Sequence, residues 1–414
     1  MTTQGFDADR LARLKPWMQR WVDEDKYAGA QTLIARRGEV VFCDQVGQRD
    51  VANALPWERD TIVRIYSMTK PITSTILLML YEDALCHLDT PLDEFLPEMA
   101  DRQVLIEGAE RIDQVRPAET RLTLHHLLTH TSGFTYGFNT GVLAETMQER
   151  QLNFSPRRVL PDGTVLSPGQ DSLELMVKDL AELPLNFDPG ARWNYSVSTD
   201  VLGRVIEVIT GQPLDQVFRE RVLDPLGMDD TGFTVPEAKQ DRLAACYVKT
   251  DDDPMKLMDR GQGTAFSDGK VAILSGGGGL CSTVDDHLKF AEMLRLGGEY
   301  NGTRLLAPKS VEMMTRNGLR GDLTSMGQPV FSEVSYDGVG FGLGVAVMLD
   351  PGVAKTAGSE GDFGWGGMAS TVFWVDPKAE MTCIFFTQLV PSSSYPVRKE
   401  IRALAYSSLT TPDR

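Results

Sequence analysis

Two serine–lysine pairs with the spacing S-x-x-K are the first residues in this sequence that could do covalent chemistry. One is Ser67-Met68-Thr69-Lys70, and the other is Ser267-Asp268-Gly269-Lys270. A serine hydroxyl becomes a useful nucleophile when an adjacent group takes or shares its proton, and a lysine can do so if burial and neighbours favour its neutral form. The pattern therefore indicates an acyl-transfer site. Because it occurs twice, its surroundings must decide between the copies.

The first pair is followed by a segment that predicts a buried helix. Residues 71–81 are mostly apolar, and the proline at their start is tolerated in a first helical turn. Ser67 would then lie at a helix N-terminus, where free backbone N–H groups and the helix dipole favour a developing negative charge. Lys70 would share its face of the helix and reach the Ser67 hydroxyl. Ser67 is therefore the predicted nucleophile, and Lys70 is its activating partner.

The second pair lies in a segment rich in Gly and Asp, with no helical pattern behind it. Residues 265–269, Ala-Phe-Ser-Asp-Gly, come close to the G-x-S-x-G nucleophile elbow, which needs a strand before it and a helix after it. Residues 258–264 do not read as a strand, and His287 alone of the histidines follows Ser267. We therefore interpret Ser267 as a loop serine. A Ser-His-Asp triad assembled in space stays open, although none is needed if Lys70 and a tyrosine move the proton.

No metal or cofactor site is predicted. The five histidines lack the H-E-x-x-H spacing, and the five cysteines are scattered without a C-x-x-C pair. The glycine run 276–279 fits neither the G-x-x-x-x-G-K-[ST] nor the G-x-G-x-x-G frame. We expect a site that works without a cofactor, and free buried thiols in a reducing cytoplasm.

Composition restricts the class of partner. The chain has 414 residues and a formal net charge of −17, with 42% hydrophobic and 24% charged residues. These proportions are ordinary for a folded globular protein, whereas nucleic-acid binding requires clustered Lys and Arg. The N-terminal residues do not read as a signal peptide, and the longest apolar stretch, 72–81, is too short to span a bilayer. We expect a cytoplasmic protein without a nucleic-acid or membrane partner; the sequence does not predict its oligomeric state.

The elements that must hold these residues come from both ends of the chain. Residues 6–25 carry apolar side chains at helical spacing, and β-rich runs at 31–35 and 40–43 flank a short turn containing Gly38. Closely joined strands must pair antiparallel. Further strands are predicted at 341–348, 371–375 and 381–388, and a final helix at 395–407.

These elements predict an α/β (α+β) fold with two lobes. Residues 1–66 and 290–414 form an antiparallel sheet flanked by N- and C-terminal helices. Residues 67–289 form an inserted lobe that is mostly helical by its apolar period. We expect the active site in the groove between the lobes, where ligand sites often lie.

Five motifs occur in order along nearly the whole chain. They are Val63-Arg64-Ile65-Tyr66-Ser67-Met68-Thr69-Lys70, Leu127-Leu128-Thr129-His130-Thr131-Ser132-Gly133, Tyr195-Ser196, Gly278-Gly279-Leu280-Cys281-Ser282-Thr283 and Trp365-Gly366-Gly367. Together they resemble the class C β-lactamase superfamily, especially its family VIII carboxylesterase branch. The resemblance implies a β-lactamase-like fold, in agreement with the two lobes predicted above.

The resemblance also implies roles for single residues. Ser67 is similar to the acylated serine, Lys70 to the lysine that orients and polarises it, and Tyr195 to the tyrosine that relays the proton between serine and leaving group. The backbone N–H groups of Ser67 and Met368 would form the oxyanion hole. Met368 follows the Trp-Gly-Gly triplet at a position that matches the family's edge strand.

Two departures from the superfamily bear on the substrate. β-Lactamases carry a Lys-Thr-Gly triplet where this chain has Trp365-Gly366-Gly367, and Tyr-x-Asn where it has Tyr195-Ser196-Val197. Replacing a cation and an amide by apolar side chains favours a neutral ester over an anionic amide. Trp365, Gly366 and Gly367 are therefore predicted to bind substrate. Tyr136, like Phe134 and Phe138, is a candidate for an aromatic pocket wall, and core packing explains each equally well.

The resulting hypothesis is a carboxylesterase that hydrolyses short-chain acyl esters through a Ser67 acyl-enzyme, with weak activity on β-lactams such as cephalosporins. An acyltransferase, a D-amino-acid peptidase and a β-lactamase are alternatives with the same site, and Trp365 in place of lysine argues against the last two. A catalytically silent ligand-binding protein is the alternative of another class. The joint presence of Ser67, Lys70 and Tyr195 argues against it.

Overall fold

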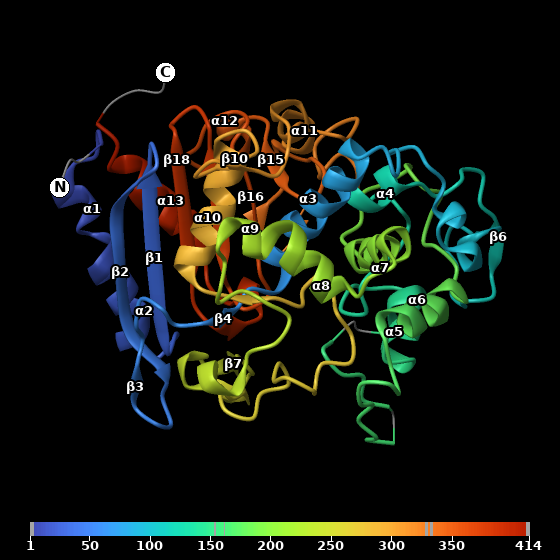
Figure 1. The fold of residues 1–414 in the computed structure, drawn as a ribbon, viewed down its shortest axis with the longest axis horizontal. Coiled ribbons are helices and arrows are strands. Elements are labelled where there is room, and N and C mark those ends of the chain that lie inside the picture. The colour runs from blue at the N-terminus through green and yellow to red at the C-terminus, as the bar shows by residue number, and fades with distance from the viewer. Residues whose placement is uncertain (1–3, 153–154, 161, 328–329, 332–333, 411–414) are drawn as a thin grey trace.

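A large sheet built from both ends of the chain organises the computed structural model (Figure 1). The structure describes residues 4–152, 155–160, 162–327, 330–331 and 334–410, so the first three residues of the N-terminal segment lie outside it. The sheet has eight strands, and every neighbouring pair is antiparallel. In spatial order the strands are β14 (Val339–Phe341), β15 (Ala346–Met348), β16 (Phe363–Gly366), β17 (Val372–Asp376), β18 (Met381–Phe386), β1 (Gly29–Arg36), β2 (Glu39–Asp50) and β3 (Leu55–Pro56). The predicted fold class is confirmed.

The predicted N-terminal hairpin is confirmed in β1 and β2. Its two turn residues, Arg37 and Gly38, have φ values of 54° and 81°. Two successive residues with positive φ match the right-handed twist of the flanking strands, and glycine adopts this conformation without steric cost.

The two faces of the sheet are covered by different helices. Side chains alternate along a strand, so Phe373 and Ile384 belong to the core that also contains Phe290, whereas Trp374 and Phe385 belong to a second core. The second core packs against the helices of both chain ends, visible at the left of Figure 1. The covering helices are α1 (Ala8–Leu11), α2 (Leu14–Asp23) and α13 (Val397–Ser407) on one face, and α10 (Val284–Arg295) on the other.

Two predicted elements are each divided in the structure. The helix expected over 6–25 breaks between α1 and α2, because Pro16 has no N–H to donate to the carbonyl of Ala12. The strand expected over 341–348 is instead the hairpin β14–β15. Its turn contains Gly344 at φ 90°, where a Cβ would lie 2.1 Å from Ser74 Oγ, so glycine lets the turn approach α3 (Thr69–Glu82) closely.

Helices predominate among the regular elements in the middle of the chain, part of which lies on the right side of Figure 1. In the described part of the chain, no helix is both long and apolar enough to cross a membrane. The remaining helices are α4 (Leu124–Leu128), α5 (Val142–Glu149), α6 (Leu173–Ala181), α7 (Ser198–Thr210), α8 (Leu214–Phe218), α9 (Asp224–Leu226), α11 (Pro308–Met314) and α12 (Pro351–Ala354). The short strands are β4 (Val63–Arg64) with β9 (Cys281–Ser282), β5 (Gln103–Leu105) with β6 (Val115–Pro117), β7 (Cys246–Val248) with β8 (Lys256–Asp259) and β19 (Leu389–Val390), β10 (Glu299–Tyr300) with β11 (Thr303–Arg304), and β12 (Val330–Phe331) with β13 (Val334–Ser335).

Candidate active site

Ser67 lies in a single 3-10 turn, Tyr66–Met68, directly before α3. The helix predicted over 71–81 is confirmed, and most of its residues are buried. Ser67 itself is partly exposed, whereas Lys70 one turn later is fully buried. Tyr66 has a φ of 44°, a conformation that is rare for a bulky residue. The nucleophile candidate therefore stands at a sharp bend that joins a loop to a buried helix.

Lys70 brings the candidate residues together. Its Nζ atom donates hydrogen bonds to Ser67 Oγ at 3.2 Å, to Tyr136 Oη at 2.9 Å and to the Gly277 carbonyl at 2.6 Å. An ammonium group has three N–H donors and no acceptor, so three acceptors satisfy it completely. This arrangement fits a charged lysine that holds the Ser67 hydroxyl in place.

Two tyrosines and Trp365 continue from Lys70 as a connected polar chain. The Tyr136 hydroxyl shares a hydrogen bond with Tyr195, and Trp365 Nε1 donates to Tyr195 Oη at 3.2 Å. Lys70 Nζ lies 4.8 Å from the centre of the Tyr195 ring. The Trp365 N–H and the Lys70 cation therefore both contact the Tyr195 side chain. Trp365, predicted only as a substrate contact, therefore also orients Tyr195.

Tyr136, a candidate for the pocket wall, also belongs to this polar chain. Burial raises the pKa of its hydroxyl well above the ordinary value, and the negative charges of Tyr195 and Asp200 add to the effect. Tyr136 therefore stays a neutral phenol that accepts from Lys70 and donates to Tyr195. Of its aromatic neighbours, Phe138 is 58% exposed and stacks on its ring at 4.8 Å, whereas Phe134 is buried in the core.

Asp200, on α7, is a residue of the site that the sequence analysis missed. Its Oδ1 accepts hydrogen bonds from Ser275 Oγ and from the Gly277 N–H at 3.1 Å. Burial raises the pKa of this carboxyl, and the charge of Lys70 opposes the rise. The same Gly277 gives its carbonyl to Lys70, so one peptide segment links the buried anion to the buried cation. The glycine run 276–279, which fits no nucleotide motif and overlaps the fourth motif of the family resemblance, was the available signal.

Gly277 can occupy this place because it has no side chain. A Cβ there would lie 2.4 Å from Asp200 Oδ2, closer than real Cβ atoms come to other atoms. Gly367 makes a similar close approach to the segment before Ser67, because its Cβ would lie 2.4 Å from the Ile65 carbonyl oxygen. Glycines therefore bring two backbone segments against the residues that flank Ser67.

The strand that leads to Met368 is not an edge strand as expected. β16 is the third strand of the sheet and lies between β15 and β17. The pairing with β15 involves Phe363 and Gly364, however, and leaves Trp365 and Gly366 beyond its register. Met368 follows in the turn between β16 and β17 and is 39% exposed. The structure thus places the predicted oxyanion segment beside the 3-10 turn that carries Ser67.

His130, within the second sequence motif, is fully buried and neutral. Burial lowers its pKa well below the ordinary value, and the charge of Lys70 lowers it further. Its Nδ1 lies 3.1 Å from Ser196 Oγ, and its ring packs against Tyr195 at 4.9 Å. The motif therefore fixes the loop that carries Tyr195.

The second S-x-x-K copy is arranged differently. Ser267 Oγ donates to the Thr264 carbonyl at 2.9 Å and accepts from Gln240 Nε2 at 3.1 Å, and Lys270 Nζ donates to the Gly263 carbonyl at 3.1 Å. No helix follows it, as predicted. His287, the histidine considered with it, is enclosed by phenylalanines of the sheet core. Within the ranges that the structure describes, no group of three or more His, Cys, Asp or Glu side chains could hold a metal.

Comparison with known proteins agrees with this geometry. The sequence profile of the family described as Beta-lactamase matches residues 14–407. Esterase EstB of Burkholderia gladioli is 32% identical over 400 residues, covering 93% of this chain and 92% of the relative. Monacolin J acid methylbutanoyltransferase of Aspergillus terreus is 30% identical over 360 residues, covering 83% and 81%. The solved structure of "EstCE1, a hydrolase with promiscuous acyltransferase activity" has a TM-score of 0.76 and 28% identity, covering 96% of this chain and 99% of its own.

Proposed function

We propose a specific reaction for this chain, which belongs to the beta-lactamase family and is a serine hydrolase of the esterase or acyltransferase kind. The reaction is hydrolysis of short-chain acyl esters through an acyl-enzyme on Ser67. The observation that carries the proposal is the hydrogen bond from the buried Lys70 to Ser67 Oγ at a helix N-terminus.

In the first step Ser67 Oγ attacks the ester carbonyl carbon and gives up its proton toward Tyr195. The carbonyl π electrons move to the oxygen, which the N–H groups of Ser67 and Met368 stabilise. When the tetrahedral intermediate collapses, the C–O bond to the alcohol breaks and Tyr195 returns the proton to the leaving oxygen. Lys70 holds the Ser67 hydroxyl in place and does not itself exchange the proton.

In the second step a water molecule attacks the acyl-enzyme carbonyl. Tyr195 takes one proton from the water, the bond to Ser67 Oγ breaks, and that oxygen recovers the proton as the carboxylic acid leaves. Tyr136 keeps its own proton. Its hydroxyl accepts a hydrogen bond from Lys70 and donates one to Tyr195, which fixes the positions of both side chains. Acylation and deacylation thus use the same two residues in opposite directions.

A neutral, apolar substrate is supported by the residues around this site. Trp365 replaces the cation of the related Lys-Thr-Gly triplet, and Val197 replaces the amide of Tyr-x-Asn. Trp365 is nearly buried, and Val197 is fully buried. An anionic amide would leave polar groups unpaired here. We expect slow turnover of cephalosporins and fast turnover of simple esters.

The test compares p-nitrophenyl acetate and butyrate with a cephalosporin and a D-alanyl peptide. Hydrolysis of the esters by wild type and roughly 10⁴-fold or greater loss in Ser67→Ala are expected. The matched control is Ser267→Ala, which should keep full activity. A fluorophosphonate probe followed by peptide mass mapping should mark Ser67. If Ser67→Ala keeps wild-type activity, or if the probe leaves Ser67 of folded protein unmodified, the proposal is wrong.

Acyl transfer to an alcohol is a second candidate, favoured by the methylbutanoyltransferase relative and by EstCE1, a hydrolase with promiscuous acyltransferase activity. The same acyl-enzyme would be attacked by an alcohol oxygen in place of water. Product analysis with p-nitrophenyl butyrate and added alcohol separates the two outcomes. If the butyrate ester of the added alcohol exceeds free butyrate, the enzyme is an acyltransferase. If free butyrate is the sole product, the enzyme is a hydrolase.

A further inference from the structure

The peptide that would supply the second oxyanion donor is held from behind by an arginine of the last helix. Arg398, in the first turn of α13, donates from Nη2 to the Gly367 carbonyl at 3.2 Å and to the Thr371 carbonyl at 3.4 Å. The Gly367 N–H donates to the same Thr371 carbonyl at 2.8 Å. The guanidinium therefore bridges both sides of the turn between β16 and β17.

The Gly367 carbonyl and the Met368 N–H belong to one peptide group. A trans peptide is planar, and its C=O and N–H point in opposite directions. Fixing the carbonyl toward Arg398 therefore turns the Met368 N–H away from α13. Because the guanidinium is charged, its hydrogen bond also polarises the peptide and strengthens the N–H as a donor.

The glycines of the Trp-Gly-Gly triplet make room for this arrangement. A Cβ on Gly366 would lie 2.4 Å from Arg398 Nη2, so any side chain there would displace the guanidinium. A Cβ on Gly367 would lie 2.4 Å from the Ile65 carbonyl oxygen, two residues before Ser67. One glycine thus admits the arginine, and the other lets the same turn approach the nucleophile segment.

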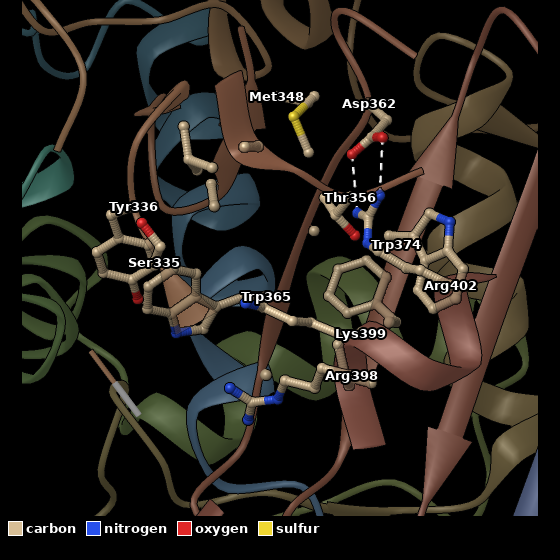
Figure 2. Close-up of a pocket in the computed structure, with 17 residues that line it drawn as sticks. Ser335, Tyr336, Met348, Thr356, Asp362, Trp365, Trp374, Arg398, Lys399 and Arg402 are labelled. Atoms are coloured by element: carbon tan, nitrogen blue, oxygen red, sulfur yellow. Dashed lines mark hydrogen bonds and ion pairs between the residues drawn. The ribbon is translucent and has the colours of Figure 1, made fainter. Parts of the chain in front are cut away.

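A cavity of about 130 Å³ adjoins the arginine on the α13 side of β16. Figure 2 shows Arg398 and Trp365 among the residues that line this cavity, and Arg402 pointing toward Asp362, with which it forms an ion pair. Lys399 also lines the cavity and is exposed. Removal of the Arg398 side chain would enlarge a space that already exists, so a small guanidinium compound could enter it.

We propose that Arg398 is a positioning residue for the oxyanion hole, acting through the Gly367–Met368 peptide. The inference rests on the proposed function, because Ser67 must be the atom that is acylated. Arg398 touches no reacting atom in this scheme. It holds the Met368 N–H in the direction in which a developing oxyanion needs it.

The test measures Arg398→Met and Arg398→Lys beside Lys399→Met, the neighbouring residue of the same cavity. Loss of an oxyanion donor typically costs about 10²- to 10³-fold, so a misdirected donor should lower kcat for p-nitrophenyl butyrate by about ten- to hundredfold, with little change in KM. The rate of fluorophosphonate labelling at Ser67 and the affinity of a boronic acid should fall in parallel. Arg398→Lys, which keeps the charge and a donor, should lie between Arg398→Met and wild type. Methylguanidinium should partly restore Arg398→Ala, which leaves space for it, and Lys399→Met should match wild type.

Three results would overturn the inference. The first is an unchanged labelling rate in both arginine variants, and this readout holds even if wild type hydrolyses no ester. The second is a loss confined to an anionic ester such as a hemisuccinate, which would make Arg398 a substrate contact. The third is an equal loss in Lys399→Met, which would indicate general damage to α13. Failure of wild type to label at Ser67 would instead refute the proposed function together with this inference.

Discussion

Ser67 and Ser267 each stand three residues before a lysine, in two regions of very different structure. Ser67 precedes the 14-residue helix α3, and Lys70 is buried one turn later with its hydrogen bond aimed back at the serine. Ser267 lies in a loop, where its hydroxyl proton is donated to the Thr264 carbonyl. Lys270 is half-exposed and donates to a different carbonyl, that of Gly263.

The S-x-x-K spacing alone therefore does not place the lysine against the serine. Helical geometry brings residues three apart onto one face, whereas a loop sets no such relation. The acceptors of Lys70 come from distant parts of the chain, since Tyr136 and Gly277 lie 66 and 207 residues away. Reactivity at the first site is therefore expected to come from tertiary partners that the second copy lacks in the described structure.

Replacing each lysine by methionine in turn tests most directly whether the two sites differ in function. Lys70→Met should lower kcat/KM for p-nitrophenyl butyrate by roughly 10³-fold, because Ser67 and Tyr195, the two groups that exchange the proton, both lose their cation. Lys270→Met should change kcat/KM by less than about twofold. Equal losses in the two variants, measured on protein with native circular dichroism, would contradict the comparison.

The two tyrosines near Lys70 are expected to have different roles. Tyr195 transfers the proton, whereas Tyr136 positions Lys70 and Tyr195. Tyr195→Phe should cost about 10²-fold or more in kcat, whereas Tyr136→Phe should cost about tenfold, since Tyr136 remains a neutral phenol whose raised pKa keeps its proton in place. Steady-state kinetics with p-nitrophenyl butyrate measures both. The reverse order of losses would assign proton transfer to Tyr136.

Much of the fold could be predicted because its signals are local. The helix after Ser67, the β1–β2 hairpin and the final helix follow from apolar period and turn residues, and five ordered motifs indicated the family. The division into two lobes and the catalytic roles stay predictions. The position of Asp200, the contact of Tyr136 with Lys70 and the interior position of β16 could not be predicted. Each of these features depends on contacts between segments that are distant in the sequence, and the local sequence pattern does not indicate such contacts.

Asp200 tests a tertiary partner that acts through the backbone. In Asp200→Asn the side-chain oxygen can still accept from Ser275 and Gly277, so chiefly the negative charge is lost. Because that charge compensates the buried Lys70, kcat should fall by about tenfold, with a smaller change in KM. The matched control is Asp268→Asn, an exposed carboxyl inside the second S-x-x-K copy, which should be neutral. A fully active Asp200→Asn enzyme would show that the charge is not needed.

The smallest expected effect concerns Ser267. This serine should contribute to stability and not to turnover, the opposite of Ser67. Ser267→Ala removes a donor to the Thr264 carbonyl and an acceptor for Gln240 Nε2 in a site that is 6% exposed. A lost buried hydrogen bond of this kind costs about 1 kcal/mol, measurable as a lower midpoint in urea unfolding. Ser67→Ala, at a partly exposed hydroxyl, should leave the urea midpoint nearly unchanged while it abolishes turnover. If Ser267→Ala lost activity at native stability, the second copy would belong to the chemistry, and the contrast between the two regions would fail.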